Sequence, residues 1–228
     1  MNDKFLIALG AASALFLVRN IYTMFMVLPD EAAQGAIYRI MFFHIPSWFT
    51  CFSCFFFSGI ASAYAIAKRN FKADSWAISI TEVGLAFTLI GLATGMIWAK
   101  IIWGIWWTWD ARLTWAFITA LVYGGYLMMR NMIDDPSERL RLTGVLNIFA
   151  FTSVAITYKA IEWWRTQHPG PILSFRTGGG NTDPAIEAMI YQNWLALLML
   201  AIVLVALRFR QEEIKREIEG LRRLAYAR

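Results

Sequence analysis

The chain has 228 residues, of which 58% are hydrophobic and only 16% are charged. Soluble domains usually carry about 25% charged residues, so this composition argues against a soluble domain and predicts a membrane protein. The formal net charge is +5, but the positions of the basic residues explain it without nucleic acid, and the two cysteines are too few for a disulfide framework.

Six apolar segments follow one another along the chain, each near the roughly 20 residues that a helix needs to cross a bilayer. They lie at 5–28, 42–67, 76–98, 113–129, 142–161 and 188–207. The first has Lys4 ahead of an apolar core, as a signal peptide does, but its apolar character continues to Leu28, which favours an uncleaved span. We therefore expect an all-α integral membrane protein with six transmembrane helices.

The distribution of Lys and Arg predicts the orientation of these helices. If the N-terminus is cytoplasmic, most of the 21 basic residues lie on the cytoplasmic side, so both termini are expected there. Residues 1–207 then form a six-helix membrane domain. Residues 208–228 form a charged tail in which Ile214, Ile218 and Leu221 recur at helical spacing, which predicts an amphipathic helix on the membrane or on a partner.

Three short motifs receive simpler interpretations. Cys51 and Cys54 share one helix face, and two small buried hydrophobic residues are favoured over redox chemistry, so neither is assigned a role. The sequence GLATG (91–95) has small residues four apart, which permits close helix contact. The sequence GGGNTDP (178–184) predicts a flexible outer loop, and it lacks the Lys-Ser/Thr pair of a phosphate loop.

The sequence WGIWWTWDARLT (103–114) places four tryptophans between the third and fourth predicted spans, on the outer side. Trp103, Trp106 and Trp107 have the i, i+3, i+4 spacing of one helix face, so we expect a face of indoles that stacks on a planar ligand. The alternative is an aromatic belt at the membrane interface. That alternative accounts well for five other tryptophans, namely Trp48, Trp76, Trp163, Trp164 and Trp194.

Charged residues surround this tryptophan cluster. Lys100 and Arg112 bracket it, and arginine binds carboxylates in a bidentate manner, so a flat apolar ligand with carboxylate edges would suit the segment. Asp110 is expected to pair with Arg112 or with a backbone donor and so to shape the loop. A plain surface ion pair is the alternative.

Both histidines of the chain are predicted to lie on the same outer side. His44 precedes Pro46 in FFHIPSW, which places it near a helix start, and His168 lies in the turn-rich sequence TQHPGP. Two imidazoles beside an aromatic platform are suited to be the two axial ligands of a haem iron. A purely structural role for each ring is the alternative.

With these residues assembled, the sequence resembles the CcmC family of cytochrome c maturation, whose members carry a tryptophan-rich signature. The resemblance covers nearly the whole chain. It is carried, in order, by YRIMFFHIP (38–46), WGIWWTWDARLT (103–114), EWWRTQH (162–168) and DPA (183–185).

The resemblance implies a haem carrier in the bacterial inner membrane that holds noncovalent haem b on the periplasmic face. It implies that His44 and His168 ligate the iron above a platform formed by the signature, namely Trp103, Gly104, Trp106, Trp107, Trp109 and Asp110. Arg112, Lys100 and Arg39 are the candidates for binding the haem propionates. The implied partners are the haem chaperone CcmE, which receives the haem, the subunits CcmA, CcmB and CcmD, and membrane lipid.

Three classes of function are therefore compared. A haem carrier that is not an enzyme is favoured. A permease subunit that moves haem across the bilayer with an ABC ATPase would need a polar path, for which the predicted spans offer only Arg19, Glu82 and Lys159. A lyase or quinone oxidoreductase is disfavoured, because the haem lyases that the family resembles carry additional histidines within their spans, and this chain has only two in total.

Overall fold

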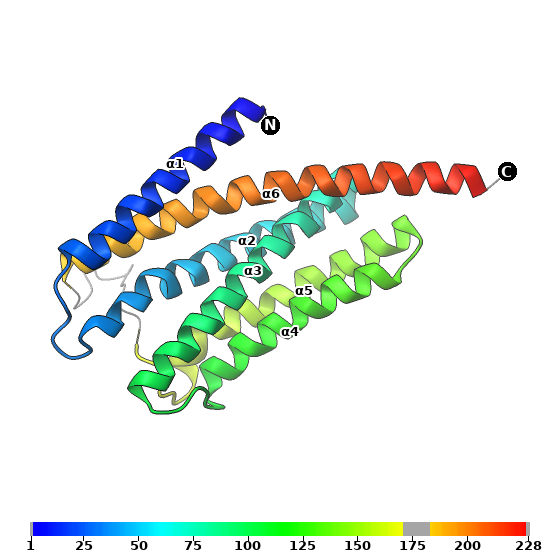
Figure 1. Cartoon of the computed structure of the whole chain (residues 1–228). Coiled ribbons are helices and arrows are strands. Elements are labelled where there is room, and N and C mark those ends of the chain that lie inside the picture. Colours follow the sequence, from blue (N-terminus) through cyan, green and yellow to red (C-terminus); the bar gives the residue numbers. More distant parts are fainter. Residues whose placement is uncertain (1, 171–182, 227–228) are drawn as a thin grey trace.

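The computed structural model describes residues 2–170 and 183–226, and in this part of the chain it is a bundle of helices without strands (Figure 1). The α-helices are α1 (Asp3–Tyr22), α2 (Met41–Lys68), α3 (Phe71–Ile102), α4 (Ala111–Met132), α5 (Pro136–Trp163) and α6 (Pro184–Tyr226). Two short helices, η1 (Thr23–Val27) and η2 (Ala36–Ile40), connect α1 to α2. The expectation of an all-α protein is confirmed for the described residues.

Five helical segments are long and apolar enough to cross a membrane, which supports an integral membrane protein. They are Asp3–Val27, Ala36–Lys68, Phe71–Ile102, Pro136–Trp163 and Pro184–Ala225. Helix α4 lies at the fourth predicted span but is not among them. Its middle holds the sequence Tyr-Gly-Gly-Tyr (123–126), which lowers its hydropathy.

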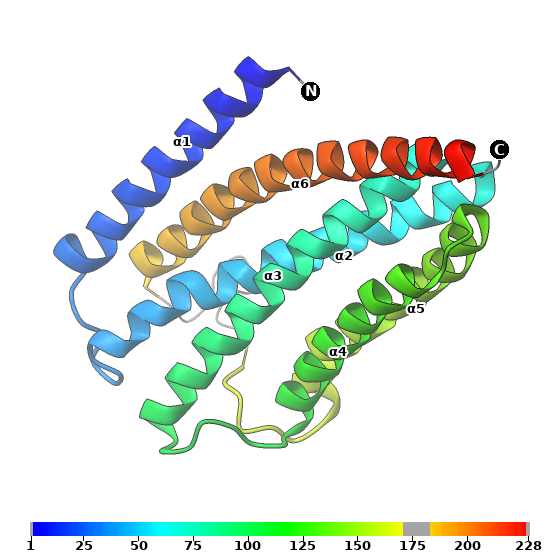
Figure 2. The same ribbon diagram turned by 45° about the vertical axis from the view of Figure 1, so that its right-hand side comes forward.

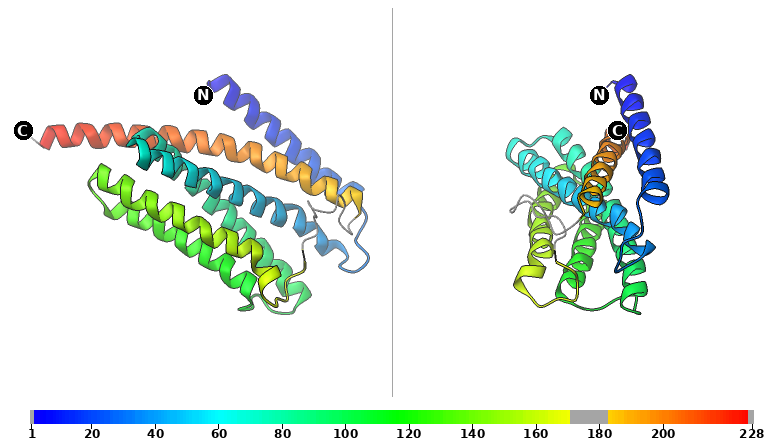
Figure 3. Two further views of the ribbon diagram at one scale, coloured as in Figure 1. Left: turned by 180° about the vertical axis from the view of Figure 1, so that it is seen from behind. Right: turned by 90° about the vertical axis from the view of Figure 1, so that its left-hand side faces the viewer.

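The helices alternate in direction, so their connections gather at two ends of the bundle (Figures 1 and 2). We call the end formed by residues 23–40, 103–110 and 164–170 the aromatic end. We call the opposite end, formed by residues 69–74, 130–139 and 212–219, the ionic end. Helix α1 packs on α6 at one edge, α2 and α3 form the centre, and α4 pairs with α5 at the other edge (Figure 3).

Apolar packing holds the centre of the bundle together. Phe55 of α2 stacks on Tyr123 of α4 with ring centroids 3.6 Å apart, and both side chains are fully buried. Cys51 and Cys54 belong to the same core as free thiols, which agrees with their interpretation as small buried residues. Lipid tails are as apolar as these side chains, so the hydrophobic effect contributes little to helix association within a bilayer. Tight packing and interhelical hydrogen bonds therefore matter more here.

Small residues and polar side chains provide those close contacts. A Cβ atom at Gly91 would lie 2.9 Å from Trp48, and one at Gly95 would lie 2.9 Å from His44, so the predicted close helix contact at GLATG is confirmed. Asn147 of α5 donates to the hydroxyl groups of Ser58 and Ser62 at 2.7 and 2.8 Å. These contacts fix α2 against both α3 and α5.

Helix α6 differs from the expected boundary at its C-terminal end. It continues without a break through residue 208, so the predicted tail, as far as Tyr226, is the last part of a 43-residue helix. The apolar residues Ile214, Ile218 and Leu221 are exposed, while Glu219 pairs with Arg139 of α5 at 2.8 Å. Of the predicted loop GGGNTDP, residues 178–182 lie outside the described residues.

Candidate functional site

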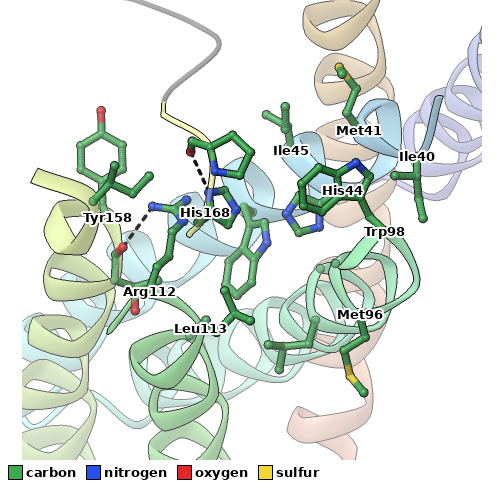
Figure 4. Close-up of a pocket in the computed structure, with 18 of the residues that line it drawn as sticks. Ile40, Met41, His44, Ile45, Met96, Trp98, Arg112, Leu113, Tyr158 and His168 are labelled. Atoms are coloured by element: carbon green, nitrogen blue, oxygen red, sulfur yellow. Dashed lines mark hydrogen bonds between the residues drawn. The ribbon is translucent and has the colours of Figure 1, made fainter. Parts of the chain in front are cut away.

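A cavity of about 330 Å³ opens at the aromatic end, between α2, α3, α4 and α5 (Figure 4). This volume lies at the lower end of the range found for small-molecule sites, about 300–1,000 Å³. Its wall is mostly apolar, and two histidines and one arginine converge on it. The cavity is therefore the leading candidate for the functional site.

His44 approaches this cavity from the first turns of α2. Its ring packs against the backbone of α3 at Gly95, where the absent side chain leaves the room that the imidazole occupies. The His44 Nδ1 atom lies 3.2 Å from the hydroxyl of Thr94, which itself donates to the carbonyl of Ile90 at 2.7 Å. Because the hydroxyl proton is already used, Nδ1 carries the hydrogen, and the lone pair on Nε2 has no partner in the part of the chain that the structure describes.

His168 approaches the cavity from the segment that follows α5. Its Nδ1 atom lies 2.8 Å from the carbonyl oxygen of Pro169, and a carbonyl can only accept, so Nδ1 again carries the hydrogen. Burial, with the positive charge of Arg112, lowers the pKa of His168 to about 4. The ring is therefore neutral near pH 7, with Nε2 available as a ligand.

The structure brings the two histidines together. Their ring centroids are 6.5 Å apart and their planes differ by 27°. Metal–imidazole bonds are about 2 Å long, so a metal ion held between two rings needs the rings this close. Among the described residues no group of three or more His, Cys, Asp and Glu side chains could hold a metal ion. Two imidazoles therefore suit a metal that brings its own remaining ligands.

The tryptophan segment is not the predicted helix face. Helix α3 ends at Ile102, and Gly104 has a φ of 77°, a left-handed conformation that glycine adopts without strain and that ends the helix. Residues 103–110 form a loop instead. The expectation of Trp103, Trp106 and Trp107 on one helix face is therefore wrong.

The loop conformation separates the four tryptophans. Trp103 and Trp107 line the cavity, and the buried Nε1 atom of Trp107 has no hydrogen-bond partner among the described residues, which leaves a spare donor beside the cavity. Trp106 and Trp109 are 53% and 74% exposed and are not part of the wall. Two of the four predicted platform indoles therefore meet the cavity.

Two further indoles complete the wall, and the sequence interpretation missed both. Trp48 was assigned to the interface belt, but it is only 7% exposed and lines the cavity, so that assignment is wrong. Its position four residues after His44, on the same helix face, is the signal that could have identified it. Trp98 also lines the cavity, where its Nε1 atom donates to the side chain of Gln34 at 2.8 Å.

Only one of the three candidate cations lies at the cavity. Arg112 lines it and donates to the carbonyl of Thr157 at 3.2 Å. Lys100 is exposed and donates to the carbonyl of Gly104. Arg39 is held by Asp30 and by the carbonyls of Met24 and Leu28. Neither Lys100 nor Arg39 is part of the wall.

Both carboxylate oxygens of Asp110 accept hydrogen bonds that stabilise the loop. It is the N-cap of α4, and its Oδ1 atom accepts from the backbone N–H of Leu113 at 2.9 Å. Of the two predicted partners, the backbone donor is therefore the one observed, and the described residues contain no ion pair between Asp110 and Arg112. Its Oδ2 atom accepts from Thr166, a contact that the sequence did not suggest.

These features define a class of protein: a helical membrane protein with a cavity at one end, in which two neutral imidazoles, four indoles and one cation meet. Comparison with known proteins identifies the particular family. The family model for heme exporter protein C, CcmC, matches residues 1–224, and the chain belongs to this family.

Curated relatives agree with this assignment. The chain is 32% identical to heme exporter protein C of Bradyrhizobium diazoefficiens, over 96% of this chain and 83% of the relative. It is 28% identical to heme exporter protein C of Escherichia coli K12, over 89% of this chain and 81% of the relative. It is 30% identical to heme exporter protein C of Haemophilus influenzae, over 83% of this chain and 76% of the relative. A role in the handling of haem is therefore supported.

Proposed function

We propose that this protein binds haem b noncovalently in the cavity, with the iron between His44 and His168. The observation that carries the proposal is the 6.5 Å spacing of the two rings, each with Nδ1 engaged and with no partner to Nε2 among residues 2–170 and 183–226. A porphyrin supplies the four equatorial ligands that the protein lacks and leaves two axial positions for imidazoles.

The remaining residues of the wall have matching roles in this proposal. Trp48, Trp98, Trp103 and Trp107 provide flat apolar surface for the macrocycle. Arg112 provides a positive charge for a propionate, since its guanidinium has a backbone carbonyl as its described hydrogen-bond partner. Lys100 and Arg39 would have to release their present partners to take part, so we assign the propionate to Arg112.

We further propose that the chain crosses the bacterial inner membrane six times and that both termini lie in the cytoplasm. Helix α4 is then a span in addition to the five apolar helical segments given above. The excess of Lys and Arg near the ionic end supports this orientation. Helix α4 packs on α5 and is 22 residues long, which suffices to cross the hydrocarbon core. The aromatic end then lies on the periplasmic side.

In this arrangement the protein is a carrier and not an enzyme. Haem bound at the rim of the bundle is accessible to a second protein, and the noncovalent ligands can be exchanged. We propose that residues 1–207 hold the haem for transfer to the chaperone CcmE, in a complex with CcmA, CcmB and CcmD, and that the tail 208–228 lies in the cytoplasm.

The test is the absorption and electron paramagnetic resonance spectrum of the purified full-length protein loaded with haem. The wild type should show six-coordinate low-spin iron. His44→Ala and His168→Ala should each lose this signal, and added imidazole should restore part of it by replacing the missing ring. Lys100→Ala, which changes an exposed residue outside the cavity wall, serves as the control. Wild-type spectra in both histidine variants would refute the ligand assignment.

A permease that moves haem itself is the alternative function, and the structure offers it little support. The three charged residues considered for a polar path already have partners: Glu82 pairs with Arg208, Lys159 with Glu162, and Arg19 donates to Gln192. Haem that accumulates outside vesicles lacking this chain, with the other subunits present, would favour a carrier. Loss of export from such vesicles would favour a permease.

A further inference from the structure

A chain of three hydrogen bonds connects the tryptophan segment to the loop that bears His168. The backbone N–H of Leu113 donates to Oδ1 of Asp110 at 2.9 Å, and the hydroxyl of Thr166 donates to Oδ2 of the same carboxylate at 2.9 Å. The backbone N–H of His168 then donates to the hydroxyl oxygen of Thr166 at 3.0 Å. All three bonds lie in partly buried surroundings.

The chemistry of these groups fixes the direction of each bond. A carboxylate only accepts, so the single hydroxyl proton of Thr166 must point to Asp110. The lone pairs of that oxygen are then free to accept from the backbone of His168. Asp110 accepts at both carboxylate oxygens, and Thr166 both donates and accepts, so the loss of either side chain leaves its neighbour without a partner.

The two histidines differ in how they are held. His44 lies within a helix and packs against the α3 backbone at Gly95. His168 follows the end of α5 at Trp163, in a segment without regular secondary structure. Within the described part of the chain, the bond from Thr166 to Asp110 is the side-chain hydrogen bond that ties this segment to α4.

We infer that Asp110 and Thr166 are positioning residues that place the imidazole of His168 opposite that of His44. This inference rests on the proposed function, because it assigns how one of the two iron ligands is held. It gives the aspartate of the tryptophan signature a role outside the aromatic platform. The carboxylate anchors the second histidine through Thr166 and does not contact the ligand itself.

The experiment uses the full-length protein, purified and loaded with haem, with two pairs of variants. Thr166→Val removes the hydroxyl but keeps the shape, and Thr166→Ser keeps the hydroxyl. Asp110→Ala removes both acceptors, whereas Asp110→Asn retains one oxygen for the N-cap and an amide that can donate to Thr166. Asp135→Ala is the matched control, because Asp135 caps α5 in the same way, through Glu138, at the ionic end.

Thr166→Val and Asp110→Ala should lower the fraction of low-spin iron and raise the rate of haem loss by about tenfold, the usual worth of one such hydrogen bond. Imidazole should restore the low-spin signal, since His44 still binds. Thr166→Ser, Asp110→Asn and Asp135→Ala should remain close to the wild type. In a His168→Ala background, Thr166→Val should add no further change, because its effect acts through that ring.

The outcomes separate the inference from the proposed function. A wild-type protein without six-coordinate low-spin haem overturns both. A wild-type spectrum that His168→Ala abolishes but Thr166→Val leaves unchanged overturns the positioning role alone. An equal loss in Asp135→Ala also overturns it, because the effect would then be that of any lost helix cap. If Asp110→Ala does not accumulate, Thr166→Val still decides, since it leaves the cap of α4 intact.

Discussion

The two ends of α4 carry two arginines in contrasting surroundings. Arg130, in its last turn, is 3% exposed and is surrounded by acceptors from three other helices: Asp74 at 2.8 Å, Thr143 at 3.2 Å and Glu212 at 3.7 Å. Arg112, in its first turn, donates to one backbone carbonyl, and no ion pair to it is found among the described residues. The same residue type therefore forms ion pairs at the ionic end, whereas at the aromatic end it has none among the described residues.

The contrast indicates which end is built for stability and which for binding. A buried guanidinium needs acceptors and counter-charges, and at the ionic end the protein supplies both. At the aromatic end it supplies a cavity, two neutral imidazoles and an incomplete set of partners for Arg112. A ligand with an anionic group would complete that set.

The largest effect is expected from Arg130→Ala, which leaves Asp74 and Glu212 buried without their cation. Breaking a buried ion pair costs about 3–5 kcal/mol, so the variant should unfold at a clearly lower temperature in detergent and accumulate poorly in the membrane. Any folded fraction should bind haem with wild-type affinity, because the cavity is at the other end. A normal melting temperature would contradict the role assigned to the ionic end.

A smaller effect, confined to the ligand, is expected from Arg112→Ala. The loss of a charge-assisted hydrogen bond costs about 2 kcal/mol, or about thirtyfold in haem affinity, with little change in melting temperature. Arg112→Lys keeps the charge but not the bidentate geometry, so its haem affinity should lie between those of the wild type and Arg112→Ala. Titration with haem dimethyl ester, which has no free propionate, provides the control. Equal losses for haem and for the ester would argue against propionate binding.

The smallest effect distinguishes two neighbouring tryptophans. Trp107→Ala removes an indole from the cavity wall and should weaken haem binding by about tenfold, or about 1.4 kcal/mol. Trp106→Ala changes a side chain that is 53% exposed and not part of the wall, so its effect should be within about 0.5 kcal/mol of zero. Haem titration of the two proteins side by side measures the difference. Equal losses would indicate that the whole segment acts as the platform.

The positions of the helices could be predicted from the sequence because apolar segments of this length leave few alternatives. The close approach at GLATG was also predictable, since small residues four apart allow two helix backbones to come close together. The conformation of residues 103–110 was not predictable, because residues at i, i+3 and i+4 share one face only if the backbone is helical. Gly104 ends the helix before the pattern can form a face.

Contacts between segments that are distant in the sequence could not be predicted from sequence patterns. Thr166 and Asp110 are 56 residues apart, and no periodicity connects them. Trp48 was misassigned because hydropathy indicates depth along the membrane but not the direction in which a side chain points. The sequence could not show which of the three candidate cations lies at the cavity. The structure distinguishes them because the side chains of Arg39 and Lys100 bind other partners outside the cavity wall.

Helix α6 has a mechanical consequence for the whole molecule. After its first residue it contains no proline, and its one glycine is Gly220, so it has no evident hinge over most of its 43 residues and a length of about 64 Å. Near its beginning, Ile190 packs in the same cluster as Phe42 of the His44 helix, and far along it Glu212 meets Arg130. One continuous helix therefore connects the ionic end to the cluster that packs beside the His44 helix, so in the proposed orientation a single element links the two sides of the membrane.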